Sequence, residues 1–321
     1  MKNPLLLAAA ILVFAPLASA APLDTKGIPA DAQGIIHIDF GQCAKSALAA
    51  ALWQQADQKK YEAFKTQYGF DPAKDLSGVT MGLIKPADAS DAPVFFGVAR
   101  GKFSPEKITA AARQANARIT TEGNRTIIEG LNLDTESAGV SLKKTALCVI
   151  DSSTVLFAQT KPDLAKTIAA YTGQTQSYAA PAALAKLGAQ TATPLVVGYL
   201  GSDITPDAQE GGGMMPISVP KADSVSFLIA ENNANLLFRS RSAFANADDA
   251  QQLQGTLQML MGFAQMGIAK AGSGSGPQAD QARMLQKLLS TLQVNLNDST
   301  LDISFAYPVD DLVKALQTYA K

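Results

Sequence analysis

Short runs in which apolar and polar residues alternate, separated by turn sequences, recur along the whole chain and limit what it can fold into. In the run at 35–40, Ile36 and Ile38 would lie on one face of a strand and His37 on the other. Turn sequences such as Glu122-Gly123-Asn124 join consecutive runs, which predicts hairpins and antiparallel pairing. Strands are predicted at 35–40, 79–84, 94–100, 118–121, 126–129, 145–150, 154–160, 195–200, 225–230, 236–244, 294–296 and 301–307.

Helices are predicted between these strands from helical spacing of apolar residues and from capping signals. The clearest start is Ser104-Pro105-Glu106, where a capping hydroxyl precedes a proline and an acid in the first turn. A Gly/Ser stretch at 272–276 reads as a linker between two helices. Helices are predicted at 44–68, 105–115, 161–172, 246–270, 281–292 and from 308 to the end, with a short one ending near 188.

The order of these elements predicts an α+β fold, with a mainly antiparallel sheet and helices packed on one face. Both halves begin with a strand and continue with hairpins followed by helices, which suggests a duplicated unit. We expect a first α+β half at 21–190 and a second at 191–321, or one continuous domain. With 47% hydrophobic and 17% charged residues, the chain can bury a core.

Residues 1–20 have the features of a cleavable secretory signal. Lys2 is followed by an uncharged apolar run at 5–17 and by Ala18-Ser19-Ala20, which predicts cleavage before Ala21. No cysteine lies at or just after that point, so we expect an exported protein, periplasmic or secreted, without a lipid anchor. No later segment predicts a transmembrane helix, because even the uncharged stretch 251–269 is rich in glutamine and glycine.

The two cysteines, Cys43 and Cys148, would then lie in a compartment where disulfides form. A disulfide between them is one interpretation, provided that the strands near them are neighbours. Two unpaired, buried thiols are the other interpretation.

Catalytic chemistry has few candidates because the chain contains a single histidine, His37. A zinc site built on several imidazoles is therefore excluded. Asp39 follows on the same strand face and could orient His37 as a base, but a histidine inside such a strand is more often structural. No nucleophile motif accompanies the pair, so we predict no catalytic residue and no metal site.

A hydrolase built on paired carboxylates needs no histidine and stays an alternative. Capping and turn formation also explain Asp71 and Asp75, which flank Pro72. The glycine-rich stretches 211–213 and 272–276 lack the context of a phosphate loop, so no cofactor is predicted. The balance of 27 basic and 28 acidic residues leaves no basic excess for nucleic acid. The candidate acids are Asp71, Asp75, Glu122, Glu129, Asp302 and Asp310.

The predicted helix at 246–270 is apolar around most of its circumference. Either the sheet and the 281–292 helix cover this surface, or it is a methionine-rich surface for an apolar ligand or partner, because thioethers adapt to varied shapes. Two methionines in the long loop 201–220 could act as its lid. The candidate surface consists of Met259, Phe263, Met266, Met214 and Met215.

Three stretches carry a resemblance to a known group of proteins. They are 29–34 leading into His37-Ile38-Asp39, then Tyr68-Gly69-Phe70-Asp71-Pro72 with 75–80, and Gly97-Val98-Ala99-Arg100-Gly101-Lys102-Phe103. They resemble a group of secreted bacterial proteins that has no assigned activity. The resemblance implies an exported, non-lipidated bacterial protein and assigns no functional residue.

The leading functional hypothesis from the sequence is therefore a non-catalytic exported protein that binds an envelope protein partner. A carboxylate-based hydrolase and a carrier of an apolar ligand on the helix at 251–270 are the alternatives. The sequence leaves the identity of the partner or ligand open.

Overall fold

The computed structural model describes residues 23–55, 58–85, 93–123, 125–135, 140–188, 194–204, 220–232, 234–272 and 277–319. The predicted signal at 1–20, Met214 and Met215 lie outside the described residues. The chain forms two compact units, one made of Met1–Ala180 with Val313–Lys321 and the other of Pro181–Leu312.

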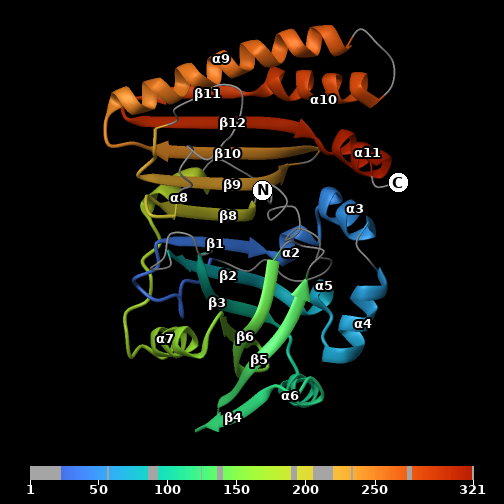
Figure 1. Ribbon diagram of the computed structural model, residues 1–321, viewed down its shortest axis with the longest axis vertical. Coiled ribbons are helices and arrows are strands. Elements are labelled where there is room, and N and C mark those ends of the chain that lie inside the picture. The colour runs from blue at the N-terminus through green and yellow to red at the C-terminus, as the bar shows by residue number, and fades with distance from the viewer. Residues whose placement is uncertain are drawn as a thin grey trace. The chain divides into compact units, whose positions relative to one another are not determined.

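The first unit is built on an antiparallel sheet with strand order β1-β2-β3-β7-β6-β5-β4 (Figure 1). Each neighbouring pair is antiparallel, and most pairs are hairpins, as the turn sequences predict. The strands are β1 (Gly34–Asp39), β2 (Leu76–Ile84), β3 (Val94–Gly101), β4 (Arg118–Glu122), β5 (Arg125–Thr135), β6 (Val140–Asp151) and β7 (Thr154–Ala158).

Helices cover both faces of this sheet. On one face, α6 packs Ala112 against Val149 and Val155. On the opposite face, α7 places Tyr171 beside Val98, close enough that both side chains border Gly27. Strand β7 is buried on both sides, because Val155 and its neighbour Leu156 point to opposite faces. The helices are α2 (Phe40–Cys43), α3 (Ala47–Gln55), α4 (Gln58–Tyr68), α5 (Pro72–Asp75), α6 (Pro105–Gln114) and α7 (Lys161–Thr172).

The second unit has an antiparallel sheet with strand order β11-β12-β10-β9-β8. Helix α8 packs Leu187 against Leu228 and Ala230 on one face of it. Helix α9 packs on the other face, where Leu253 and Leu257 contact the cluster of Phe244 and Leu301. The elements are α8 (Ala182–Gly188), β8 (Pro194–Gly201), β9 (Ser224–Asn232), β10 (Asn235–Ala243), α9 (Ala247–Gly272), α10 (Pro277–Thr291), β11 (Gln293–Asn297), β12 (Thr300–Pro308) and the first turn of α11 (Val309–Tyr319), whose residues from Val313 belong to the first unit.

The two units share one pattern of connections. Each starts with three consecutive antiparallel strands, β1-β2-β3 and β8-β9-β10. The chain then leaves the sheet through helices and returns in a hairpin whose last strand, β7 or β12, pairs with the third strand. A helix follows that last strand in both cases. This repeated order is what a duplication would produce, with the additional hairpin strands β4 and β5 in the first unit.

Glycines in the sheets make room for phenylalanines on neighbouring strands. Gly97 pairs with Phe157, and a Cβ atom at Gly97 would lie 2.6 Å from that ring and 2.2 Å from the carbonyl oxygen of Thr80. Gly198 pairs with Phe227 in the same way, with a Cβ–ring distance of 2.3 Å. A side chain larger than hydrogen would displace the ring, so these positions require glycine for space and not for an unusual backbone angle.

The predicted α+β class and the mainly antiparallel pairing are confirmed. The expectation that helices pack on one face is corrected, because helices cover both faces of each sheet. The predicted helix at 44–68 is wrong in one respect, because the structure has two helices in this segment, α3 and α4, and the first of them starts only at Ala47. Ser46 explains this later start: its hydroxyl accepts the backbone N–H of Ala49 at 3.0 Å and so caps α3.

Candidate functional site

Helix α9 is held on its sheet by one apolar side. Ala250 is fully buried in a cluster with Phe244 and Leu301, and Leu253 and Leu257 pack against the same cluster. The helix begins at a cap in which the side-chain oxygen of Asn246 accepts the backbone N–H of Asp249 at 2.8 Å. Its inner side is therefore fixed by ordinary core packing.

The outer side of α9 is also apolar, although it faces solvent. Met259, Phe263 and Met266 are 42%, 46% and 62% exposed. A solvent-facing helix side normally carries polar residues. We call the set Gly255, Met259, Phe263 and Met266 the α9 outer face. Among the described residues, the large hydrophobic side chains that are exposed all lie on α9 or α10, the others being Leu260 and Leu285.

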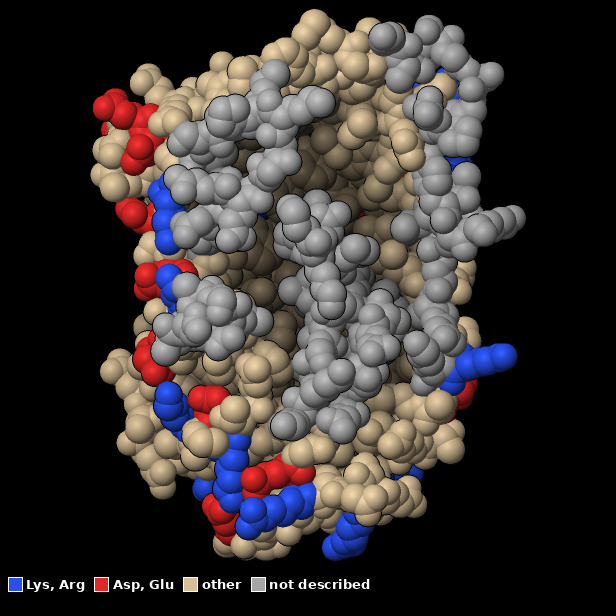
Figure 2. Space-filling view, viewed as in Figure 1, with Lys and Arg blue, Asp and Glu red and all other residues tan. Residues whose placement is uncertain are grey.

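Charge is absent from the sequence of α9 between Asp249 and Lys270. In Figure 2, the surface over the middle of α9, at the top of the view, accordingly shows no Lys, Arg, Asp or Glu side chain. The sequence predicts that Met259, Phe263 and Met266 form one apolar surface. In the structure, these three side chains are exposed on the same side of α9. The two lid residues proposed with them, Met214 and Met215, lie outside the described part of the chain.

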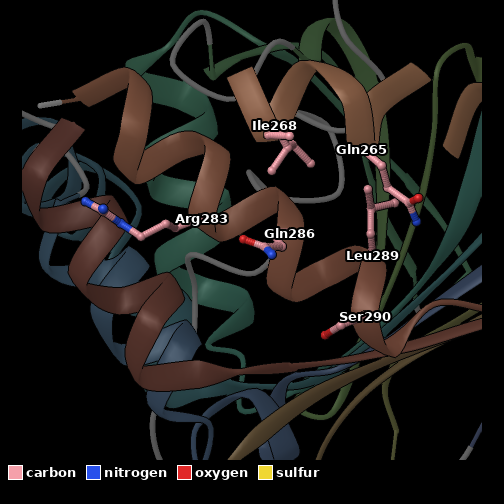
Figure 3. A pocket seen from close by; sticks show the side chains of 7 residues that line it. Gln265, Ile268, Arg283, Gln286, Leu289 and Ser290 are labelled. Carbon is pink, nitrogen blue, oxygen red and sulfur yellow. The ribbon is translucent and has the colours of Figure 1, made fainter. Parts of the chain in front are cut away.

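A groove of about 430 Å³ lies between α9 and α10. Its apolar part comes from Ile268 and Leu289, and Arg283 lies at one end, paired with Asp280 at 2.6 Å (Figure 3). Sequence reasoning missed this groove, because its residues come from two helices whose faces meet only in the folded unit. It is lined by Gln265, Ile268, Ala269, Arg283, Gln286, Leu289 and Ser290.

His37 and Asp39 are both buried, and each forms a contact within the fold. His37 Nδ1 lies 2.9 Å from the hydroxyl oxygen of Thr80 on the neighbouring strand. A carboxylate oxygen of Asp39 accepts the backbone N–H of Gln42 at 2.8 Å and caps α2. These contacts are those of a structural histidine and a helix cap.

The candidate acids in the first unit are occupied by caps and ion pairs. Asp71 caps α5 and accepts a hydrogen bond from the Tyr61 hydroxyl. Burial, together with that hydrogen bond, raises the pKa of Tyr61 above its ordinary value. Asp75 accepts the backbone N–H of Asp71 at 2.7 Å, and Glu129 pairs with Lys161 at 3.1 Å.

The remaining candidate acids are arranged in the same way. Glu122 lies 3.9 Å from Lys161 Nζ, on the exposed side of the β4–β5 hairpin. Asp302 forms two hydrogen bonds with Arg241, at 2.7 and 2.8 Å, across paired strands. Asp310 is exposed in the first turn of α11. Each carboxylate thus has a structural role or faces solvent, and none of these contacts joins two of them as an acid and a base.

Cys43 and Cys148 do not form the disulfide that was one interpretation of the sequence. Both thiols are buried, with Cys43 on α2 just after β1 and Cys148 on β6. Strands β2, β3 and β7 separate β1 from β6 in the sheet, so the condition that their strands be neighbours fails. Burial raises the pKa of the Cys148 thiol to about 11.

The described residues contain no group of three or more His, Cys, Asp or Glu side chains placed to hold a metal ion. Within the same residues, no helix combines the length and the apolar character needed to cross a membrane.

Comparisons with known proteins show a likeness in fold. Crystal form I of TP0453 has a TM-score of 0.53 and 9% identity, and the match covers 95% of this chain and 100% of that one. Form III has a TM-score of 0.51 at 9% identity over 92% and 99% of the two chains, and form IV one of 0.51 at 10% over 93% and 97%. No family model and no curated protein matches the sequence. At this identity the likeness shows a shared α+β fold with an antiparallel sheet.

Proposed function

We propose that this chain is an exported, non-catalytic binding protein whose binding surface is the α9 outer face. The observation that carries the proposal is the exposure of Met259, Phe263 and Met266 on one side of a helix whose other side is already packed. Large apolar side chains are rarely clustered on the surface of a soluble protein, and such a patch is often a binding site. Methionine suits this role because its flexible thioether adapts to the partner.

Burial of this face offers a useful binding energy. Each of the three side chains still exposes about half of its surface, and covering that surface would contribute roughly 1 kcal/mol each. No charged group has to be stripped of water in the process, because none lies between Asp249 and Lys270. The face therefore favours an apolar partner surface and disfavours nucleic acid.

The contacts of the polar candidates support a role without catalysis. His37 bonds to Thr80, Asp39 caps α2, and four of the candidate acids form caps, hydrogen bonds or ion pairs. To act as an acid or a base, any of these groups would have to leave a contact that stabilises the fold.

Export is proposed from the signal-like sequence at 1–20. The first described residues fit this proposal, because Ile28 is fully buried and its carbonyl oxygen accepts the N–H of Tyr178 at 2.7 Å. Cleavage before Ala21 would leave this anchored segment intact.

Photo-crosslinking in cells that produce the protein tests the binding role. A benzophenone amino acid replaces Met266, the most exposed of the three large side chains on the α9 outer face, and the matched control replaces Lys166 on the exposed side of α7. We expect a discrete crosslinked species at Met266 and none at Lys166. If the crosslinker yields no product at any of the three positions, Met259, Phe263 and Met266, the proposed function is refuted.

A second candidate function, a carrier of an apolar ligand, is favoured by the groove between α9 and α10. Ile268 and Leu289 could contact an apolar chain there while Arg283 pairs with an acidic head group. Displacement of a fluorescent fatty acid from the purified protein tests this role. We expect Leu289→Gln to weaken the binding at least about tenfold, a loss of about 1.4 kcal/mol, and binding that the substitution leaves unchanged would count against the carrier.

A further inference from the structure

One line of residues runs along the exposed side of α9 from its first turn to Met266. Its members follow one another at intervals of three or four positions, the spacing of a helix seam that packs against a second helix. From Asp248 to Met266 every member is exposed. The line consists of Asp248, Gln252, Gly255, Met259, Phe263 and Met266, and in the sequence of α9 the same spacing continues to Lys270.

The charges on this line have opposite signs at its two ends. Asp248 lies in the first turn of α9 and Lys270 in the last, with no charged residue on the helix between Asp249 and Lys270. A second α9 that runs antiparallel would bring the acidic end of each helix to the basic end of the other. It would also oppose the two helix dipoles favourably.

The same antiparallel arrangement has a consistent register. When two copies cross at Met259, residues that are equally distant from it meet: Asp248 with Lys270, Gln252 with Met266, and Gly255 with Phe263. The pairing of opposite charges and the pairing of a glycine with the largest side chain thus occur in one and the same register. A two-fold axis requires this self-complementarity of a single surface.

We propose that two copies of the chain associate through their α9 outer faces as an antiparallel helix pair centred on Met259. This inference rests on the proposed function and names the partner as a second copy. A Cβ atom at Gly255 would have no other atom within 4 Å, so the backbone is open there. Phe263 of the second copy fits over this open backbone.

The size of the face sets the strength of the association. A helix of 26 residues is about 39 Å long and about 10 Å wide, so each copy buries roughly 400 Å². A standard interface buries about 800 Å² per partner. The dimer is therefore weak, and we expect a dissociation constant on the order of 10–100 μM.

Disulfide trapping tests the register. In the proposed dimer, the Met259→Cys variant places its two new thiols at the two-fold axis, where they oxidise to a disulfide-linked dimer. The matched control, Met266→Cys, leaves its thiols about 21 Å apart along the helix axis. We expect dimer from the first variant and at least about tenfold less from the second. Equal trapping at both positions would overturn the antiparallel register.

Sedimentation of the wild-type protein between about 5 and 500 μM tests association directly, over a range that brackets the expected constant. A monomer throughout would overturn the inference. Asp248→Lys and Lys270→Asp should each weaken the dimer at least about threefold, and the double variant should restore it. An unrestored double variant would contradict the charge pairing.

The photo-crosslinking experiment separates this inference from the proposed function. A product with twice the mass of the chain supports both. Two outcomes would overturn the dimer but keep the α9 outer face as the binding surface. One is a crosslink to a different protein. The other is that the monomeric protein floats with neutral phosphatidylcholine vesicles and that Met266→Ser abolishes this flotation.

Discussion

Arg100 fixes Asp24 to strand β3. Its Nε donates a hydrogen bond to Asp24 Oδ2 at 3.0 Å, and both side chains are 28% exposed. A second guanidinium nitrogen lies 3.4 Å from the Tyr171 hydroxyl. Burial alone would lower the pKa of Arg100, but the hydrogen bonds to Asp24 and Tyr171 outweigh it and raise the pKa. The segment that follows the predicted signal is thus part of the fold.

We expect Arg100→Ala to lower the free energy of unfolding by about 1–3 kcal/mol, because it leaves the half-buried carboxylate of Asp24 without this partner. Urea denaturation measures the change. The control is Arg283→Ala, which removes an ion pair whose side chains are 57% and 60% exposed. Its effect should stay below about 0.5 kcal/mol, and equal losses in the two variants would contradict the role given to Arg100.

The native protein should begin at Ala21. Signal peptidase cleaves after small residues such as Ala18-Ser19-Ala20, and the anchored residues start only at Asp24. Intact-mass spectrometry of protein purified from its natural host measures the N-terminus. A product that retains Met1 and fractionates with the cytosol would disprove export.

Gly97→Ala and Gly267→Ala should change stability in opposite directions. At Gly97 the new methyl group would lie 2.2 Å from the carbonyl oxygen of Thr80, which belongs to the paired strand and cannot move away cheaply. We expect a loss of about 2–3 kcal/mol. At Gly267, inside α9, a Cβ atom meets nothing within 4 Å. Alanine should stabilise the helix there by about 0.5–1 kcal/mol. Thermal unfolding measures both changes in stability. If the two substitutions change stability in the same direction, the prediction is wrong.

Both cysteines should be protected thiols. With its pKa raised to about 11 by burial, Cys148 is almost entirely protonated at pH 8 and should react with Ellman's reagent only after denaturation. Two thiols per chain should titrate in denaturant without reductant. A count of zero under those conditions would reinstate the disulfide between Cys43 and Cys148.

The raised pKa of Cys148 also predicts how stability changes with pH. The folded state keeps the proton to about pH 11, whereas an exposed thiol loses it near pH 8.5–9. The stabilisation is therefore complete below about pH 8.5 and is lost as pH rises toward 11. Burial raises the pKa of Tyr68 and Tyr307 too, so Cys148→Ala serves as the comparison. Its unfolding free energy should fall less steeply between pH 9 and 11, and parallel curves would show that Cys148 does not contribute.

Local patterns predicted much of the fold because they act over a few residues. The alternation at 35–40 corresponds to β1, and the Ser104 cap with Pro105 corresponds to α6, which begins at that proline. The methionine-rich surface could also be inferred, because the sequence of a helix determines how apolar residues are distributed around it. The start of α3 after Ser46 does not show in the apolar spacing, because that spacing begins only at Leu48.

The strands, most helices and the excess of apolar residues on α9 follow from local patterns in the sequence, because periodicity and capping act over a few residues. The order of strands in the folded sheet, in contrast, keeps β1 and β6 apart, so that Cys43 and Cys148 remain thiols. The packing of the second unit likewise determines which side of α9 is covered and which is exposed. Those outcomes depend on the order of strands and on which surfaces of the unit meet, and contacts between residues far apart in the chain leave no periodic signal in it.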